Sequence, residues 1–90
     1  MSQKVYIALQ DIEDARPIIE AITDDNPHAV LLKYPAMVRI EAEGKLVIKR
    51  ETIEEKVGRD FDLQELHLTL ITLGGNIDET DDEFILQWKN

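Results

Sequence analysis

Apolar and polar residues alternate most regularly in the middle of the chain. From Val38 to Ala42, and again from Leu46 to Ile48, every second residue is apolar. A period of two residues predicts β-strands, and Gly44 marks a tight turn between them. A three-residue turn with Gly44 at positive φ would pair the two strands as a hairpin and keep their apolar residues on one face. A two-residue turn would set those residues opposite lysines, so the longer turn is favoured.

Two helix starts follow this predicted hairpin. Thr52 and Glu55 have the spacing of a capping box, and Gly58 stands where a left-handed residue ends a short helix. Asp62 and Glu65 repeat the capping spacing. The residues placed for a hydrophobic staple at this second start are Phe61 and Leu66.

The first third of the chain reads as strand, helix and strand. Residues Lys4–Gln10 alternate as a strand does, and Asp14 can cap a helix that has Pro17 in its first turn. The polar stretch Asp24–Pro27 ends that helix, since a residue before proline avoids the α region. Residues Ala29–Tyr34 are apolar on both faces, which predicts an interior strand.

The last third of the chain predicts two more strands. Residues His67–Leu73 form the first, and Gly74 with Gly75 marks a bend, a bulge or a close backbone approach. Residues Asn76–Asp82 are polar and acidic and predict a solvated loop. Residues Glu83–Trp88 close the chain as a strand, with one face interpreted as core rather than as a partner-binding stripe. The residues of that face are Phe84, Leu86 and Trp88.

These elements predict an α+β fold in one domain, residues 1–90. Their order is βαββ followed by βααββ, and a small sandwich with mostly antiparallel pairing accommodates it. Ninety residues suffice for a single compact core, and 43% of them are hydrophobic.

Charge and cysteine content restrict the possible partners. The formal net charge is −9, which opposes binding to nucleic acid or to an anionic membrane surface. There is no cysteine, as is common in a reducing cytoplasm, and no apolar stretch is long enough to cross a membrane. We therefore expect a cytoplasmic protein with neither nucleic acid nor membrane among its partners.

The sequence contains no pattern typical of a catalytic, metal or cofactor site. His28 and His67 lie far apart, and neither has a second histidine at a metal-ligand interval. With 19 acidic residues, adjacent carboxylates are unavoidable and carry little catalytic information. Tyr34 and Met37 flank a turn, where such residues serve equally as core or as recognition surface. No catalytic residue, metal or cofactor is predicted.

Long strings of the sequence resemble one protein family. The stretch EAEGKLVIKRETIEEKVGRDFDLQEL, Glu41–Leu66, is the most specific part, and Asp25–Val30 and Leu70–Asn76 match on either side. Together they resemble the regulatory (effector or coupling) component of bacterial multicomponent phenol hydroxylases. That component belongs to the cofactorless effector proteins of soluble diiron monooxygenases, and the resemblance spans roughly residues 24–88. The short amino-terminal arm departs from relatives that have long tails.

The resemblance implies a non-catalytic protein that binds the diiron hydroxylase component near its active-site pocket. There it would alter substrate access, oxygen reactivity and the coupling of reductant use to hydroxylation, with no small-molecule ligand of its own. The segment Thr69–Ile77 is similar to the part that docks over the hydroxylase pocket. The candidate partner-binding residues are Thr72, Gly74, Gly75 and Asn76, with Asn26, Pro27 and His28 from the second string and Tyr34 and Met37 from the turn.

Two other functions stay open at this point. A stand-alone domain that senses a small molecule has a similar size and element order, and would bind its ligand in isolation. An enzyme would need a cluster of perturbed carboxylates around His28 or His67 in a cleft.

Overall fold

The computed structural model describes residues 3–88 as seven strands, two α-helices and two short 3-10 helices. In chain order they are β1 (Lys4–Gln10), η1 (Glu13–Ala15), α1 (Arg16–Asp25), β2 (Val30–Tyr34), β3 (Met37–Glu43), β4 (Lys45–Lys49), α2 (Arg50–Val57), η2 (Leu63–Leu68), β5 (Leu70–Gly74), β6 (Asn76–Glu79) and β7 (Glu83–Gln87).

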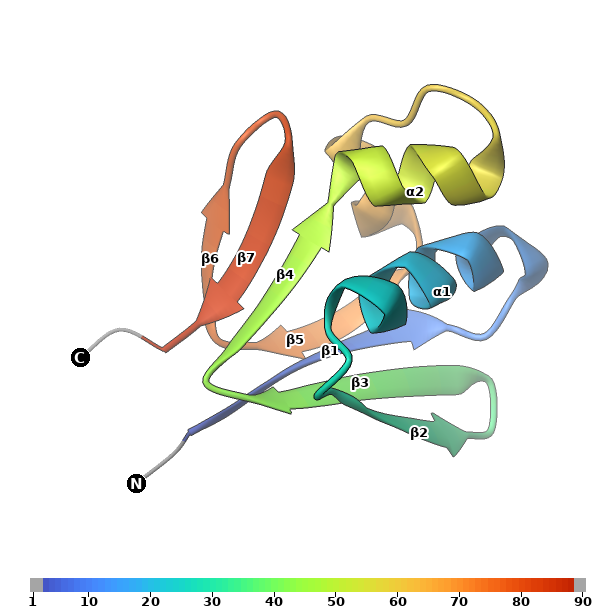
Figure 1. The fold of residues 1–90 in the computed structure, drawn as a ribbon. Coiled ribbons are helices and arrows are strands. Elements are labelled where there is room, and N and C mark those ends of the chain that lie inside the picture. Colours follow the sequence, from blue (N-terminus) through green and yellow to red (C-terminus); the bar gives the residue numbers. More distant parts are fainter. Residues whose placement is uncertain (1–2, 89–90) are drawn as a thin grey trace.

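The strands form two antiparallel sheets. The first has the order β2-β3-β1-β5 and the second the order β4-β7-β6. Both α-helices lie on one side of the four-stranded sheet, and α1 packs against α2 and β4 (Figure 1). The predicted α+β, mostly antiparallel arrangement is confirmed. Within residues 3–88, the other face of the four-stranded sheet carries no helix.

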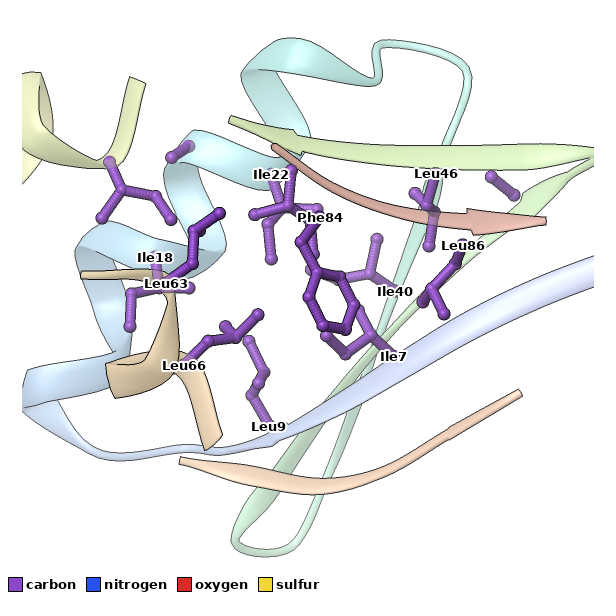
Figure 2. Packing of buried hydrophobic residues seen from close by; sticks show 14 of the residues in the cluster. Ile7, Leu9, Ile18, Ile22, Ile40, Leu46, Leu63, Leu66, Phe84 and Leu86 are labelled. Carbon is purple, nitrogen blue, oxygen red and sulfur yellow. The ribbon is translucent and has the colours of Figure 1, made fainter. Parts of the chain in front are cut away.

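The core fills the space between the two sheets and the helices. Phe84 of β7 is fully buried, and its ring lies in the middle of side chains from both sheets and α1 (Figure 2). The other fully buried large side chains are Val5, Ile7, Leu9, Ile22, Val38, Ile40, Leu46, Ile48, Ile53, Leu66 and Leu86. A fully buried aliphatic or aromatic side chain contributes about 1.5–3 kcal/mol, so this cluster is the main source of stability.

The predicted hairpin around Gly44 is wrong in its pairing and right in its faces. Strand β3 pairs with β1 and β2, whereas β4 pairs with β7 in the other sheet. Gly44 has a φ of 84° and turns the chain from one sheet to the other. The apolar residues on both sides of Gly44 still face one core. Alternation determines which side chains point inward, but it does not choose the neighbouring strand.

Two of the three predicted helix caps are wrong. Helix α2 begins at Arg50, without a side-chain cap, so Thr52 lies inside it. The Arg50 N–H donates instead to the Asp82 carbonyl oxygen at 2.9 Å, and the two side chains form an ion pair at 2.8 Å. Helix α1 follows directly from η1, so Asp14 caps neither helix. A distant carbonyl or a preceding 3-10 turn has replaced the local cap.

Other predicted end signals are confirmed. Asp62 accepts from the N–H of Gln64, and Glu65 accepts from the N–H of Asp62, which completes a capping box at η2. Gly58 ends α2 with a φ of 76°. Pro17 lies in the first turn of α1, as expected.

Four predictions about strands need correction. Strand β2 lies at an edge rather than in the interior, and four of its five residues are exposed. Residues Asn76–Glu79 form β6 instead of a loop, although all four are exposed. Residues 63–68 form η2, so the strand expected from His67 begins at Leu70. Trp88 lies outside the core with 45% of its surface exposed, and its indole N–H donates to the Lys4 carbonyl oxygen.

Candidate partner-binding surface

The uncovered face of the four-stranded sheet gathers four of the candidate residues. Tyr34 is the direct neighbour of Met37 across the β2–β3 pair, while Thr72 and Gly74 lie opposite Ala8 and Tyr6 across the β1–β5 pair. Directly opposed residues share one face of a sheet. We call this surface the outer face. Its members are Tyr6, Ala8, Gln10, Val30, Leu32, Tyr34, Met37, Arg39, Glu41, Thr72 and Gly74.

The Tyr6 ring lies in the middle of the outer face, between Arg39 and Gly74. The guanidinium carbon of Arg39 lies 3.9 Å from the centre of the Tyr6 ring, which is a cation–π contact. On its other side the ring lies against Gly74, where a Cβ atom would overlap it. Arg39 also pairs with Glu41 through Nε and Oε2 at 2.7 Å, which neutralises both charges. The outer face is therefore nearly neutral at its centre.

Strand β2 adds exposed apolar surface to the outer face. Val30 is 54% exposed and Tyr34 45% exposed. Contiguous exposed apolar residues are typical of interaction sites, particularly in a chain whose remaining surface is strongly acidic. The sequence pattern of β2, apolar on both faces, had predicted burial instead.

Gly75 and Asn76 lie at the passage from β5 to β6, outside the outer face. Gly75 has a φ of 139°, where any side chain is strained, and a Cβ there would lie 3.1 Å from Val5 Cγ1. Both glycines therefore permit close approaches within the chain itself: Gly74 to Tyr6 and Gly75 to β1. The interpretation of this pair as a structural bend is confirmed.

The string from Asn26 to His28 covers the free edge of β4. Asn26 is only 2% exposed, and its amide donates to the Val47 carbonyl oxygen at 2.7 Å and accepts from the Val47 N–H at 2.9 Å. The same Nδ2 donates to the Ile22 carbonyl oxygen at 2.7 Å. His28 Nε2 lies 3.3 Å from the carbonyl oxygen of Lys45, two residues along the same strand. The Asn26 side chain therefore stabilises the fold. Only Pro27 and His28 of this string have exposed side chains that a partner could contact.

The two histidines do not share a cleft. His67 Nε2 lies 3.9 Å from Glu79 Oε1, and His28 contacts β4 instead. An open hollow of about 720 Å³ lies between α2, η2 and β6 and is lined mostly by acidic side chains. At its rim the pKa of Glu65 is lowered, mainly because its carboxylate accepts from the Asp62 N–H and also because it binds Arg59. Within residues 3–88, no three potential ligands are close enough to hold a metal ion.

Neither α-helix within residues 3–88 has the length and apolar character that a membrane span requires.

Comparison with known proteins identifies the family. The MmoB/DmpM family model matches residues 3–87. The chain belongs to the MmoB/DmpM family. It is 59% identical, over the full length of both chains, to the phenol 2-monooxygenase stimulatory component DmpM of Pseudomonas sp. (strain CF600).

Solved structures of other MmoB/DmpM-like chains agree with this fold. A chain in a phenol hydroxylase–regulatory protein complex is 53% identical and superposes with a TM-score of 0.93, over 97% of this chain and 100% of that one. The soluble methane monooxygenase regulatory protein B is 20% identical, with a TM-score of 0.76 over 96% of this chain and 65% of that one, which indicates a shared fold.

Three members of the candidate surface, Tyr6, Val30 and Arg39, were not predicted from the sequence. Their positions depend on which strands are neighbours, and no local pattern encodes that choice.

Proposed function

We propose that this chain is the cofactorless, non-catalytic regulatory component of a multicomponent phenol hydroxylase. It binds the diiron hydroxylase component near its active site and modulates substrate access, oxygen reactivity and the coupling of reductant use to hydroxylation. The observation that carries the proposal is the 59% identity to a phenol 2-monooxygenase stimulatory component along the whole of both chains.

The outer face is the surface that docks on the hydroxylase. It combines exposed apolar side chains with Thr72, a residue of the segment that resembles the docking part of the family. Recognition surfaces are typically enriched in tyrosine, methionine and arginine and depleted of unpaired acidic residues. The rest of the molecule carries most of the 19 acidic side chains, so it is a poorer candidate for a desolvated contact.

Regulation follows from preferential binding. A protein without chemistry of its own can change an enzyme only by binding one conformation of that enzyme more tightly than another. A coupling free energy of about 1–3 kcal/mol is typical and changes the equilibrium about 5–150-fold. The chain performs this role as a single domain, residues 1–90. A cytoplasmic location belongs to the same proposal, because the partner is an enzyme that consumes cellular reductant.

Reconstituted turnover tests the proposal. Hydroxylase and reductase components are assayed for phenol hydroxylation and for reductant consumption, with increasing amounts of this chain. We expect hydroxylation to rise and reductant consumption per product to fall until the hydroxylase is saturated. Equal turnover with and without the chain would reject the function, and so would phenol binding to the isolated chain in calorimetry, which a small-molecule sensor predicts.

A pair of variants tests the surface. Tyr34→Lys places a charge on the outer face and should raise the concentration of chain needed for half-maximal stimulation by about tenfold, equivalent to about 1.4 kcal/mol. Gln64→Lys adds the same charge to the exposed side of η2 and should leave that concentration unchanged. Equal effects of the two variants would indicate long-range electrostatics instead of docking by the outer face.

A further inference from the structure

Two side chains, one from η2 and one from β6, meet beside the open hollow that these elements border. His67 Nε2, in η2, lies 3.9 Å from Glu79 Oε1, in β6. The exposed fractions of the two side chains are 44% and 25%, so water screens the contact only in part. Among residues 3–88, His67 is the one basic side chain that forms an ion-pair contact with the Glu79 carboxylate.

Packing against the core places the two side chains next to each other. The His67 ring lies edge-on to the Phe84 ring, with centroids 6.2 Å apart and an angle of 69° between the planes, which is a favourable aromatic geometry. Phe84 is fully buried and is the direct neighbour of Glu79 across the β6–β7 pair. Directly opposed residues share one face of a sheet, so Glu79 leaves the backbone on the side where Phe84 and His67 meet.

The contact joins the two ends of one continuous stretch of chain. From His67 the chain leaves η2, forms β5, turns at Gly75 and forms β6, where Glu79 is the last residue. All four residues of β6 are exposed, and β7 is its neighbour in the sheet. The stretch includes Thr72 and Gly74 of the outer face. Attachment of β6 to η2 therefore restricts the end of a segment that contributes to that face.

We propose that His67 and Glu79 form a pH-dependent tie, which fastens β6 to η2 when the imidazole is protonated and loosens when the imidazole is neutral. Histidine is the side chain that ordinarily changes charge between about pH 5 and 8, and this chain has no cysteine. An imidazolium attracts the carboxylate, whereas a neutral ring does not. A partly exposed ion pair shifts a local equilibrium by up to about fivefold, which is enough to change the order of an exposed strand. The tie belongs to the isolated chain, so it holds independently of the proposed function.

The other groups around the hollow keep their charge over this pH range. Carboxylates and guanidinium groups ordinarily do not titrate between about pH 6 and 8. A long hydrogen bond from Gln64 Nε2 to Glu79 Oε2, at 3.5 Å, does not depend on pH either. The charge of His67 is therefore what changes beside Glu79. The charged residues that line the hollow with Glu79 are Arg50 and Glu54 of α2, Asp60 of the following loop, Asp62 and Glu65 at η2, and Asp81 of the β6–β7 turn.

Backbone amide relaxation, measured by NMR on the isolated full-length chain, tests the tie. Order parameters of the β6 amides should be near the rigid value of about 0.85 at about pH 6 and should be lower at about pH 8, while those of β1 stay constant. His67→Gln and Glu79→Gln should each show the lower β6 values at both pH values, because each variant removes one charge of the pair. His28→Gln removes the other histidine and should keep the response of the unaltered chain.

Each outcome decides the proposal. A β6 response that is absent from the unaltered chain, or that persists in His67→Gln, would overturn the tie. Loss of the response in His28→Gln would place the pH sensitivity elsewhere and overturn it as well. If His67→Gln fails to fold because its contact with Phe84 is lost, Glu79→Gln leaves that contact in place and provides the same comparison.

Discussion

The edge strands β4 and β5 differ in how their unpaired backbone groups are treated: those of β4 are covered by a side chain, and those of β5 are not. At β4, the Asn26 amide occupies both backbone groups of Val47 at 2.7 and 2.9 Å. At β5, no equivalent side chain covers the strand within the described residues, and two glycines follow at its end. An edge that a protein closes contributes to its own stability, while an edge left bare of charge is available to another chain. Substitutions that uncover β4 should therefore lower stability, whereas those on β5 should lower it only where they disturb packing against β1.

The largest effect on stability is expected from Asn26→Ala. It leaves the N–H and C=O of Val47 unpaired and should lower the free energy of unfolding by about 2–4 kcal/mol, measured by urea denaturation. Asn26→Asp should cost about as much, because a carboxylate cannot donate to the carbonyl oxygens of Ile22 and Val47. His28→Ala is the matched control, since its contact at 3.3 Å is exposed. Equal effects at the two positions would contradict the assignment of Asn26 as the edge cover.

A smaller loss is expected from Gly74→Ala, which tests the packing of the open side. Its Cβ would overlap the Tyr6 ring, and overpacking of this kind costs about 1–3 kcal/mol. The loss should largely disappear when Tyr6 is replaced by serine, because the space is then free. Gly44→Ala is the control: it has open space around it, so only its φ of 84° matters and about 1 kcal/mol is expected. If the two alanine variants lost stability equally in both backgrounds, Tyr6 would not be the cause.

The smallest effect concerns Glu65, which lies in η2 and away from both edges. Its carboxylate accepts from the Asp62 N–H at 3.0 Å and from Arg59 at 3.2 Å, and these bonds lower its pKa in the folded state. The stabilisation is complete above the pKa that Glu65 has in the unfolded chain, and it disappears as the pH falls through the lower folded-state pKa. Glu65→Gln should therefore lower the unfolding temperature at neutral pH, and the difference should shrink in acid below the usual glutamate range. Glu55→Gln, at an exposed position of α2, removes one negative charge and leaves the Asp62 contact in place, so it is the control for net charge. A difference for Glu65→Gln that stays constant with pH would mean that its charge is not involved.

Side-chain patterns predicted which residues lie inside far better than which strands pair. Val38, Ile40, Leu46 and Ile48 are all buried as their alternation required, yet the hairpin they suggested does not form. Helix starts differ in the same way. The capping box at Asp62 uses neighbouring residues and was predicted correctly, whereas the start of α2 depends on the Asp82 carbonyl oxygen, 32 residues away.

The candidate surface was predictable in part. Thr72, Gly74, Tyr34 and Met37 came from two unrelated stretches, and the sheet places all four on one face. Asn26 matched the same family strings, but its side chain is buried and serves the fold. Resemblance identifies a conspicuous residue without saying whether its side chain points to a partner or to its own backbone.

By itself the sequence determined the class of fold, the inward-facing residues and the family, because alternation, end signals and long matching strings are all local properties of the chain. Only the tertiary structure decided that Gly44 separates two sheets, that Asn26 closes one edge and that β5 is left open. Those outcomes depend on which distant strands compete for the same backbone hydrogen bonds, and that competition is resolved only when the whole core packs.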